Sequence, residues 1–334
     1  MEYELSLSTI QTRNFLSLSK TLQSGKLLLM SNPKLQKVKD YCAFIEPLLS
    51  TGISQLGNRY VKLGDSDGDS MLWLGLLNSV LFPSDNKWAL KSILECQDRD
   101  GQFFRSPRKR HAHEYGFSRD MSLGLMLGII DSELSQEIAQ KWIDFIDRSR
   151  PCVVKKPKWA GGGCALRSPV YKFCPSDDDR ANITPTTWAI MNRVFSFRGF
   201  KRTDQMRLFD KADGDLSLIE AQEAPLGYQL HLKAVQSYIK YLIGQSREYS
   251  IKVGEICHKR QPENLFYEFL AKRYFSVEMI DRYLAMAEIV DGSSLSNEWM
   301  WEKSTINPRE SSGWCMLFMG KLILWHSLAS SESY

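Results

Sequence analysis

The sequence predicts an all-α fold arranged as a double ring of helical hairpins, and three observations support this prediction. Most long segments place apolar residues at helical spacing, and clusters of Val, Ile and Thr that would indicate strands are sparse. Segments that are apolar nearly all round alternate with amphipathic ones, as buried and surface helices do. Long connections rich in Gly, Pro and aromatic residues precede several of these helices.

Each expected helix combines apolar periodicity with suitable boundary residues. Ser118, Thr184 and Ser276 are candidate N-caps, and Pro185 stands at a first helical position, where its missing N–H costs nothing. The expected helices cover residues 34–50, 69–82, 85–97, 118–131, 133–149, 185–198, 227–245, 263–273, 277–290 and 311–328.

Two pairs of consecutive helices show the alternation most clearly. Segments 69–82 and 118–131 are apolar nearly all round and contain glycine, which is typical of buried helices. Their successors, 85–97 and 133–149, carry a single apolar stripe and are expected on the surface. In a double ring, the buried helices run parallel to one another and the surface helices return antiparallel, so the buried helices begin on one face.

The long connections are expected on that same face. Segments 98–117, 150–184 and 292–310 are too long for tight helix turns, and each precedes a candidate inner helix. The sequence therefore predicts one domain over residues 1–334, with residues 1–30 as a peripheral segment.

Composition excludes several classes of protein. A hydrophobic content of 43% with 25% charged residues excludes a disordered chain, and a net charge of +4 is too small to indicate nucleic acid. The basic run 105–111 is interpreted as a solvated loop, with a basic rim for an anionic polymer as the alternative. The apolar stretches are too short for a membrane span and no signal peptide is evident, so we expect a cytoplasmic or virion-associated protein without membrane contact.

The cysteine pattern predicts reduced thiols. Seven Cys residues make an odd number and form no C-x-x-C pair, which favours free thiols over a disulfide framework. Cys152, Cys164 and Cys174 could join His258 or His111 around a metal, but their spacing matches no zinc pattern. We therefore expect no metal and no cofactor.

The first candidate site is an acidic loop directly before the apolar helix 69–82. Asp65, Asp67 and Asp69 stand there, where free helix N–H groups and the positive end of the helix dipole favour carboxylates. A calcium-binding EF-hand is excluded, because counting from Asp65 places Ser70 at the required Gly and Leu76 at the required Glu. Asp69 is expected to cap the helix, which leaves Asp67 as the chemical candidate and Asp65 as a ligand contact.

Similar polar groups precede two further buried helices. His113 and Glu114 lie shortly before Arg119 and Asp120 at the start of 118–131, where Glu114 and Asp120 are candidate catalytic carboxylates and His113 and Arg119 candidate ligand contacts. The alternative is a capped helix with a surface loop, in which Arg119 and Asp120 form an ion pair at the helix start. Ahead of 185–198 the sequence carries Asp177, Asp178, Asp179 and Arg180. The first two are interpreted as a charged loop tip, and Asp179 and Arg180 as candidate ligand contacts.

Tryptophans accompany glutamates in the last long connection. Trp301, Glu302 and Trp314 are candidate ligand contacts, since aromatic faces stack on sugar rings. Packing of these tryptophans into the core is the alternative.

On these residues the chain resembles the six-hairpin glycosidase superfamily, the (α/α) toroids of five or six hairpins. Ser66-Asp67-Gly68-Asp69 with Leu76-Leu77 is similar to the inner-helix motif of its endoglucanase and chitosanase family, and Phe117-Ser118-Arg119-Asp120 resembles a helix start found in several toroid glycosidases. The resemblance implies that Asp67 touches the sugar at the cleavage point. The family's general-acid segment is absent from residues 1–60, and the nearest substitute is His113-Glu114-Tyr115-Gly116.

The resemblance implies a glycoside hydrolase that acts on a polysaccharide or oligosaccharide through carboxylate acid–base catalysis. Glu114 would protonate the leaving oxygen, and Asp67 or Asp120 would activate water or position the sugar, with the carboxyl groups about 5 to 9.5 Å apart. The alternative is a non-catalytic toroid that binds glycans or serves as a structural component of a larger assembly such as a phage particle. A terpene-type cyclase is a third alternative, prompted by a single Gln/Trp-type run at 97–103.

Overall fold

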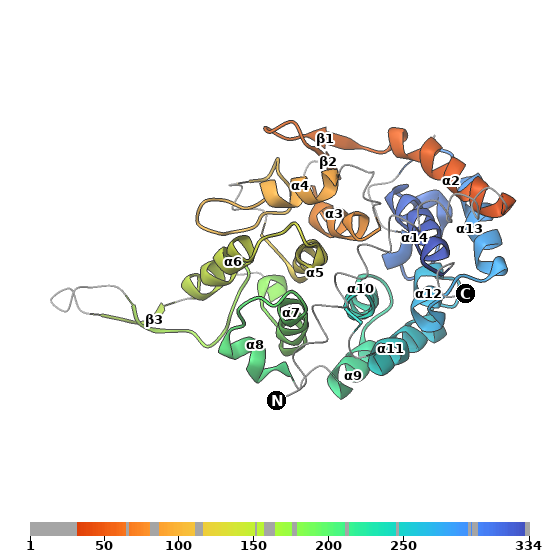
Figure 1. Cartoon of the computed structure of the whole chain (residues 1–334). Helices are drawn as coiled ribbons and strands as arrows, with labels where there is room; N and C mark the ends of the chain where they lie inside the picture. Colours follow the sequence, from red (N-terminus) through yellow and green to blue (C-terminus); the bar gives the residue numbers. More distant parts are fainter. Residues whose placement is uncertain are drawn as a thin grey trace, which may run out of the picture. The chain divides into compact units, whose positions relative to one another are not determined.

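The computed structural model shows a mostly helical chain with short strands (Figure 1). The residues it describes are 32–64, 67–80, 87–110, 116–150, 152–156, 164–175, 179–210, 214–244, 247–292, 295 and 300–330. The chain divides into two compact units, each described by itself. The terminal unit combines residues up to 49 with 274–296 and 308–334, and the main unit comprises 50–273 and 297–307. One domain over 1–334 stays a prediction.

The described residues of the terminal unit form three α-helices and two 3-10 turns. Helix α2 packs against α13 and α14, and the Tyr283 hydroxyl donates to the Met316 carbonyl at 2.9 Å between α13 and α14. The elements are α2 (Pro33–Ile45), η1 (Glu46–Leu48), α13 (Val277–Ile289), η7 (Pro308–Glu310) and α14 (Trp314–Ser330).

The main unit holds the remaining described helices and two β-hairpins. Strand β1 pairs antiparallel with β2, and β3 pairs antiparallel with β4. The elements are β1 (Thr51–Ile53), β2 (Arg59–Val61), α3 (Ser70–Asn78), α4 (Trp88–Glu95), α5 (Arg119–Ile130), α6 (Gln136–Arg148), β3 (Cys152–Lys155), β4 (Cys164–Arg167), η4 (Asp179–Ala181), α7 (Pro185–Phe197), α8 (Asp204–Leu208), α9 (Asp215–Glu223), α10 (Tyr228–Leu242), α11 (Arg247–Arg260), α12 (Leu265–Lys272) and η6 (Met300–Glu302).

Helices α3 and α5 form the centre of the main unit and pack closely through glycine. Every residue of α3 is buried, and the middle of α5 is buried as well. A Cβ on Gly75 would lie 2.1 Å from the Gly124 carbonyl oxygen, and one on Gly124 would lie 2.2 Å from the Met71 carbonyl oxygen. Only glycine therefore permits this distance between the two backbones.

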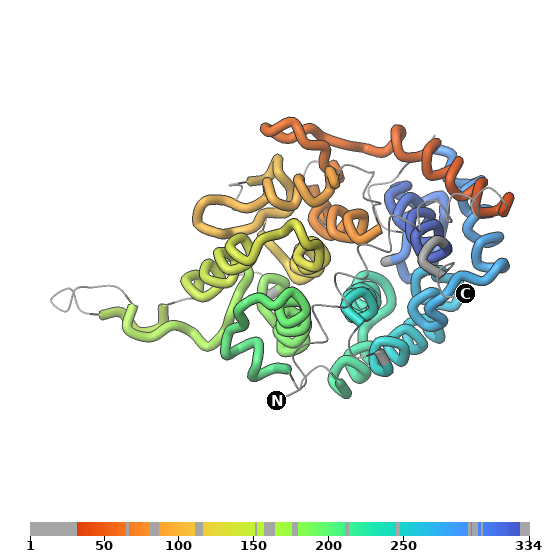
Figure 2. The backbone as a smooth tube through the Cα atoms, viewed as in Figure 1, coloured from red at the N-terminus to blue at the C-terminus, as the bar shows by residue number. Residues whose placement is uncertain are grey.

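The buried helices of the main unit contact one another in chain order. Helix α5 packs against α3 and α7, and α10 packs against both α5 and α7 (Figure 2). Helices α4 and α6 carry one buried face each, with Trp142, Ile143 and Ile146 on that of α6. The predicted alternation of buried and surface helices is confirmed for α3 to α6.

All ten expected helices are present within a few residues of their predicted ends. The sequence analysis missed α8, α9 and α11 and the two hairpins. Helix α11 buries Ser250, Val253 and Cys257, together with Gly254 against the backbone of α12. This buried face consists of small side chains at helical spacing, so the sequence lacks the stripe of large apolar residues that indicates an amphipathic helix. Among the described helices, none has the length and apolar character needed to cross a membrane.

A buried histidine in α10 makes the stability of the main unit depend on pH. Burial lowers the pKa of His231 from 6.5 to about 3. Below pH 6.5 this histidine is protonated in the unfolded chain but stays neutral in the folded chain. The free energy of unfolding therefore falls by about 1.4 kcal/mol per pH unit until the pH reaches the folded pKa. We expect urea unfolding at about pH 5 to show a loss of about 2 kcal/mol from this group relative to neutral pH.

The variant His231→Leu removes the titrating group and is expected to show a correspondingly flatter pH dependence. His326→Leu, a half-buried histidine of the terminal unit, serves as the matched control. The same pH dependence in the wild type and in His231→Leu would contradict the assignment.

Candidate functional site

Asp67 occupies the turn directly before α3, with a left-handed φ of 53° and a fully buried side chain. One carboxylate oxygen accepts from the Ser106 hydroxyl at 2.6 Å and from Nε of Arg108 at 2.9 Å. The other accepts from Nη2 of Arg108 at 2.6 Å and from the Leu63 N–H at 3.4 Å. Both oxygens are thus occupied by a two-point guanidinium pair and two further donors.

These contacts tie residues 105–110, the described part of the basic segment, to the acidic loop through Ser106 and Arg108, so this part is more than a solvated loop. Ser106 is fully buried, and its hydroxyl also accepts from the Lys109 N–H at 3.2 Å. Nη2 of Arg108 donates in addition to the Gly64 carbonyl at 2.9 Å. Because a buried carboxylate requires compensating donors, Arg108 of this segment serves the fold.

The burial of Asp67 changes its candidate role. A catalytic carboxylate must reach substrate or an attacking water, whereas this one is enclosed and holds the loop after α4 against the start of α3. Asp69 takes the predicted N-cap position, since α3 begins at Ser70, but its side chain makes no capping hydrogen bond to the helix.

Charged groups from three helix starts interact electrostatically with Arg105. Burial lowers its pKa, while the nearby carboxylates of Asp120 and Asp69 raise it and the Arg180 guanidinium lowers it again. Its Nη2 donates to the Gly116 carbonyl at 3.1 Å. Asp69 precedes α3, Asp120 lies in the first turn of α5 and Arg180 lies in η4. This group of four side chains is the helix-start cluster.

The start of α5 presents Asp120 in a defined position. Ser118 is the N-cap residue, and its hydroxyl donates to the Asp120 carboxylate. The Ser122 hydroxyl donates to the Arg119 carbonyl at 2.6 Å, and both Arg119 and Asp120 are half-buried. A carboxylate in the first turn interacts favourably with the helix dipole, and the half-buried Asp120 keeps part of its surface accessible.

The segment before α7 is ordered by backbone bonds to the chain upstream. The Phe173 N–H donates to the Ala181 carbonyl at 2.9 Å, and Thr184 caps α7 by accepting from the Thr187 N–H. Arg180 is exposed at this turn, and the backbone of Asp179 begins η4. Asp177 and Asp178 lie outside the described residues, as do Asp65, His113 and Glu114.

The two candidate tryptophans are core residues. The ring of Trp301 in η6 of the main unit is fully buried, and Asn264 donates to the Trp301 carbonyl at 3.1 Å. Trp314, at the start of α14 in the terminal unit, is 1% exposed. Neither presents a face to a ligand, so the alternative of core packing describes them. The backbone of Glu302 lies in η6 beside Trp301.

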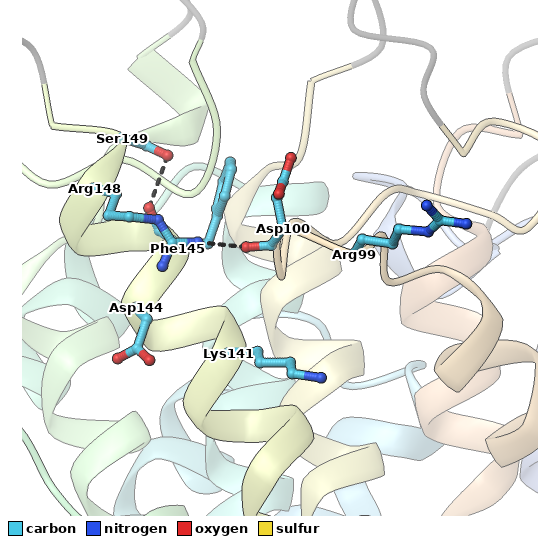
Figure 3. Close-up of a pocket in the computed structure, with 7 residues that line it drawn as sticks. All are labelled: Arg99, Asp100, Lys141, Asp144, Phe145, Arg148 and Ser149. Carbon is cyan, nitrogen blue, oxygen red and sulfur yellow. Dashed lines mark hydrogen bonds between the residues drawn. The ribbon is translucent and has the colours of Figure 1, made fainter.

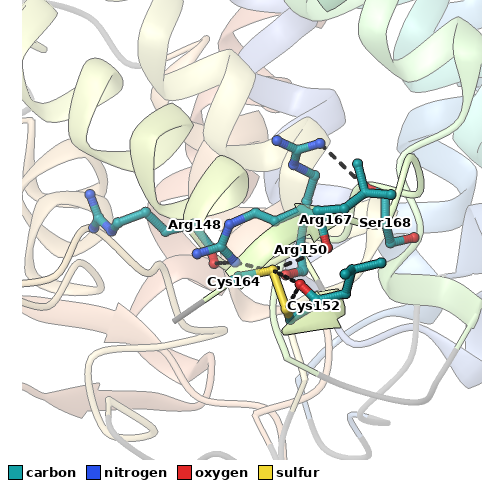
Figure 4. The surroundings of a disulfide bond; sticks show 8 residues. Arg148, Arg150, Cys152, Cys164, Arg167 and Ser168 are labelled. Atoms are coloured by element: carbon teal, nitrogen blue, oxygen red, sulfur yellow. Dashed lines mark hydrogen bonds between the residues drawn. A yellow bond between two sulfur atoms is a disulfide. The ribbon is translucent and has the colours of Figure 1, made fainter. Parts of the chain in front are cut away.

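Two cysteines form a disulfide, which corrects the prediction that all seven are reduced. Cys152 and Cys164 are bonded between β3 and β4, and the other five cysteines are free and buried (Figure 4). The hairpin brings their Cα atoms to 5.7 Å, a proximity that residue spacing alone does not reveal. Within the described ranges no group of three or more His, Cys, Asp or Glu side chains could hold a metal ion.

The disulfide predicts a thiol count. Unfolding without reductant should expose the five free thiols, and unfolding with reductant should expose all seven. In the native protein these thiols should react slowly, since burial raises the pKa of Cys42 and of Cys257 to about 12. Titration with a thiol reagent measures this, and seven reactive thiols without reductant would contradict the bond.

A surface hollow of about 520 Å³ lies between the turn after α4 and the last turns of α6 (Figure 3). Nη2 of Arg148 donates to the Asp100 carbonyl at 2.6 Å across it. The lining residues are Arg99, Asp100, Lys141, Asp144, Phe145, Arg148 and Ser149. The hollow shares the segment 98–110 with the helix-start cluster, because Arg105 follows Asp100 by five residues.

Sequence reasoning missed Arg105, Ser106 and Arg108 as parts of the site. The available signal was a basic segment that follows an acidic loop two helices later, and it becomes informative only once the loop after α4 is known to contact the start of α3. Comparisons of the chain with protein-family models, with curated proteins and with solved structures found no match.

Proposed function

We propose that this protein hydrolyses glycosidic bonds of a polysaccharide or oligosaccharide at the helix-start cluster. One observation carries the proposal: the carboxylates of Asp69 and Asp120, from the starts of α3 and α5, and the Arg180 guanidinium all act electrostatically on the half-buried Arg105. Carboxylates and guanidinium groups offer acceptors and donors to sugar hydroxyls, and the accessible Asp120 is suited to proton transfer.

In this mechanism Asp120 activates the attacking water as a general base, and Glu114, from the connection that leads into α5, protonates the leaving oxygen. The water adds to the anomeric carbon as the glycosidic bond breaks, its proton passes to the base, and the acid's proton leaves with the departing sugar. Asp69, Arg105 and Arg180 bind the sugar. Asp67 acts as a positioning residue, through the segment that carries Arg105.

The test measures release of reducing ends from a panel of neutral and anionic polysaccharides. Asp120→Asn and Glu114→Gln are each expected to lower the rate by about 100-fold or more while leaving thermal unfolding unchanged. Asp204→Asn, at a fully exposed carboxylate of α8, is the matched control. Full activity in both amide variants would contradict the assignment of these residues.

A non-catalytic glycan-binding protein, including a structural component of a larger assembly, is the second candidate. The enclosed carboxylate of Asp67 favours it, because the residue that matches the family's sugar-contacting Asp is unavailable. Binding to a glycan array that is weakened by Asp120→Asn, together with no release of reducing ends, would select this candidate.

We also propose that the helical hairpins close into an (α/α) toroid. The chain-order packing of α3, α5, α7 and α10 within the main unit supports it. A crystal structure in which the helices following α10 fail to return to α3 would overturn it.

A further inference from the structure

We propose that the glycan taken by this protein is anionic, and that its acidic groups bind a basic track beside the helix-start cluster. The inference rests on the proposed function, because it names the class of glycan bound at that face. The basic track is defined as Arg99, Lys141 and Arg148 at the surface hollow, followed by Lys155 and Lys156 on and just after β3.

The hollow has the size and chemistry of a sugar subsite. Its volume of about 520 Å³ falls within the range of small-ligand sites, about 300 to 1,000 Å³. Cations and the carboxylates of Asp100 and Asp144 line it together, with the Ser149 hydroxyl (Figure 3). Carboxylates accept from sugar hydroxyls, whereas the cations pair with acidic substituents.

The hollow lies within reach of the helix-start cluster. Five residues separate Asp100 from Arg105, so their Cα atoms are at most about 18 Å apart even for an extended chain. The segment is held in a turn, since the Asp98 carboxylate accepts from the N–H groups of Asp100 and Gln102 at 3.0 and 2.9 Å. A glycan of a few sugars can therefore occupy both places.

The β3–β4 hairpin extends the positive charge beyond the hollow. Arg167 on β4 donates to the carbonyls of Arg148 and Arg150, which ties the hairpin base to the end of α6 (Figure 4). Lys155 follows Cys152 by three residues, about 10 Å along the strand, and its side chain is exposed like that of Lys156. Arg150 lies outside the track, because it pairs with Asp147 at 2.8 Å and its side chain is only 21% exposed. Lys141 pairs with Glu137 at 2.9 Å, but its side chain is 51% exposed and lines the hollow.

Positive charge is far denser in the end of α6 and the β3–β4 connection than in the chain as a whole. The sequence from Arg148 to Pro175 contains seven Lys or Arg residues and no Asp or Glu, whereas the whole chain has a net charge of only +4. Such a local excess attracts a polyanion. A glycan fits better than a nucleic acid, because Asp100 and Asp144 can accept hydrogen bonds from the many sugar hydroxyls that a glycan carries beside its acidic groups.

The experiment measures binding of fluorescent polygalacturonate, dextran sulfate, neutral dextran and a single-stranded oligonucleotide of similar length. Polygalacturonate or dextran sulfate should bind with a Kd that rises about tenfold between about 50 and 300 mM NaCl. Lys155→Glu/Lys156→Glu should weaken that binding about tenfold or more, and Arg99→Ala/Lys141→Ala about threefold or more. The control Lys37→Glu/Lys39→Glu removes the same charge from exposed positions of α2 and should change it less than about twofold.

Three results would overturn the inference. If Lys37→Glu/Lys39→Glu weakens polyanion binding as much as the track variants do, net charge alone attracts the ligand. If the oligonucleotide binds more tightly than the glycans and depends on Lys155 and Lys156, the ligand is a nucleic acid. If neutral dextran binds with the same Kd to the wild type and to the basic-track variants, the ligand is a neutral glycan. The dextran result would leave the proposed function intact. The proposed function fails separately, if no glycan is cleaved and if Asp120→Asn does not change glycan binding.

Discussion

Gly124→Ala is expected to destabilise the protein by about 3 kcal/mol, because the added methyl group has no space. Its Cβ would lie 2.2 Å from the Met71 carbonyl oxygen and 2.5 Å from the Leu72 Cα, and both atoms belong to the backbone of α3. Relief would require α3 and α5 to move apart, which would open voids in the most buried part of the main unit. Denaturant unfolding followed by tryptophan fluorescence measures the loss.

Two other glycines supply graded controls for this experiment. A Cβ on Gly128, one turn later in α5, would lie 3.0 Å from Cδ1 of Ile93, a side-chain end that can shift, so Gly128→Ala should cost less. Gly68→Ala meets no atom within 4 Å and should be near neutral. If Gly124→Ala proved no more harmful than Gly128→Ala, the close approach of α3 and α5 would be wrong.

Asp67→Ala should produce the second large effect, a loss of about 3 kcal/mol in the free energy of unfolding. The variant removes the acceptor that satisfies Ser106 and Arg108, and it leaves Ser106 buried without that partner. Arg108 is 34% exposed, so water recovers part of its lost interaction and keeps the loss near that value. Alanine also tolerates the left-handed φ at this position poorly.

A double-mutant cycle separates the ion pair from these other contributions. Arg108→Ala alone should cost less than Asp67→Ala, and the double variant should lose less than the sum of both, because the pair can be lost only once. Strict additivity of the two losses would contradict the buried contact. Ser106→Ala, which removes one hydroxyl donor, is expected to cost about 1 kcal/mol.

The helical architecture was largely predictable because it is encoded locally. Apolar spacing and N-caps such as Thr184 and Ser276 act within a few residues, and the corresponding helices α7 and α13 begin where these signals predict. The β3–β4 hairpin escaped prediction, because its exposed strands carry no alternation between a buried and a solvated face.

The candidate site was only partly predictable, for a different physical reason. The helix starts identified Asp120 and Arg180, and in the structure both act electrostatically on Arg105. The fate of Asp67 depends on Arg108, which is distant in sequence and reaches it only after the loop folds back. The position of a carboxylate at a helix start can be predicted from the sequence. Whether it is accessible to a ligand depends on its burial and on its hydrogen-bond partners in the folded chain.

The bond between Cys152 and Cys164 has a consequence for proteolysis. A protease that cuts the backbone anywhere between these residues leaves two fragments joined through sulfur. Such a nicked protein would migrate as an intact chain on a non-reducing gel and separate into two pieces only after reduction. Because Arg167 still ties β4 to the end of α6, the base of the hairpin would keep this contact after the cut, and the nick would escape detection on a gel run without reductant.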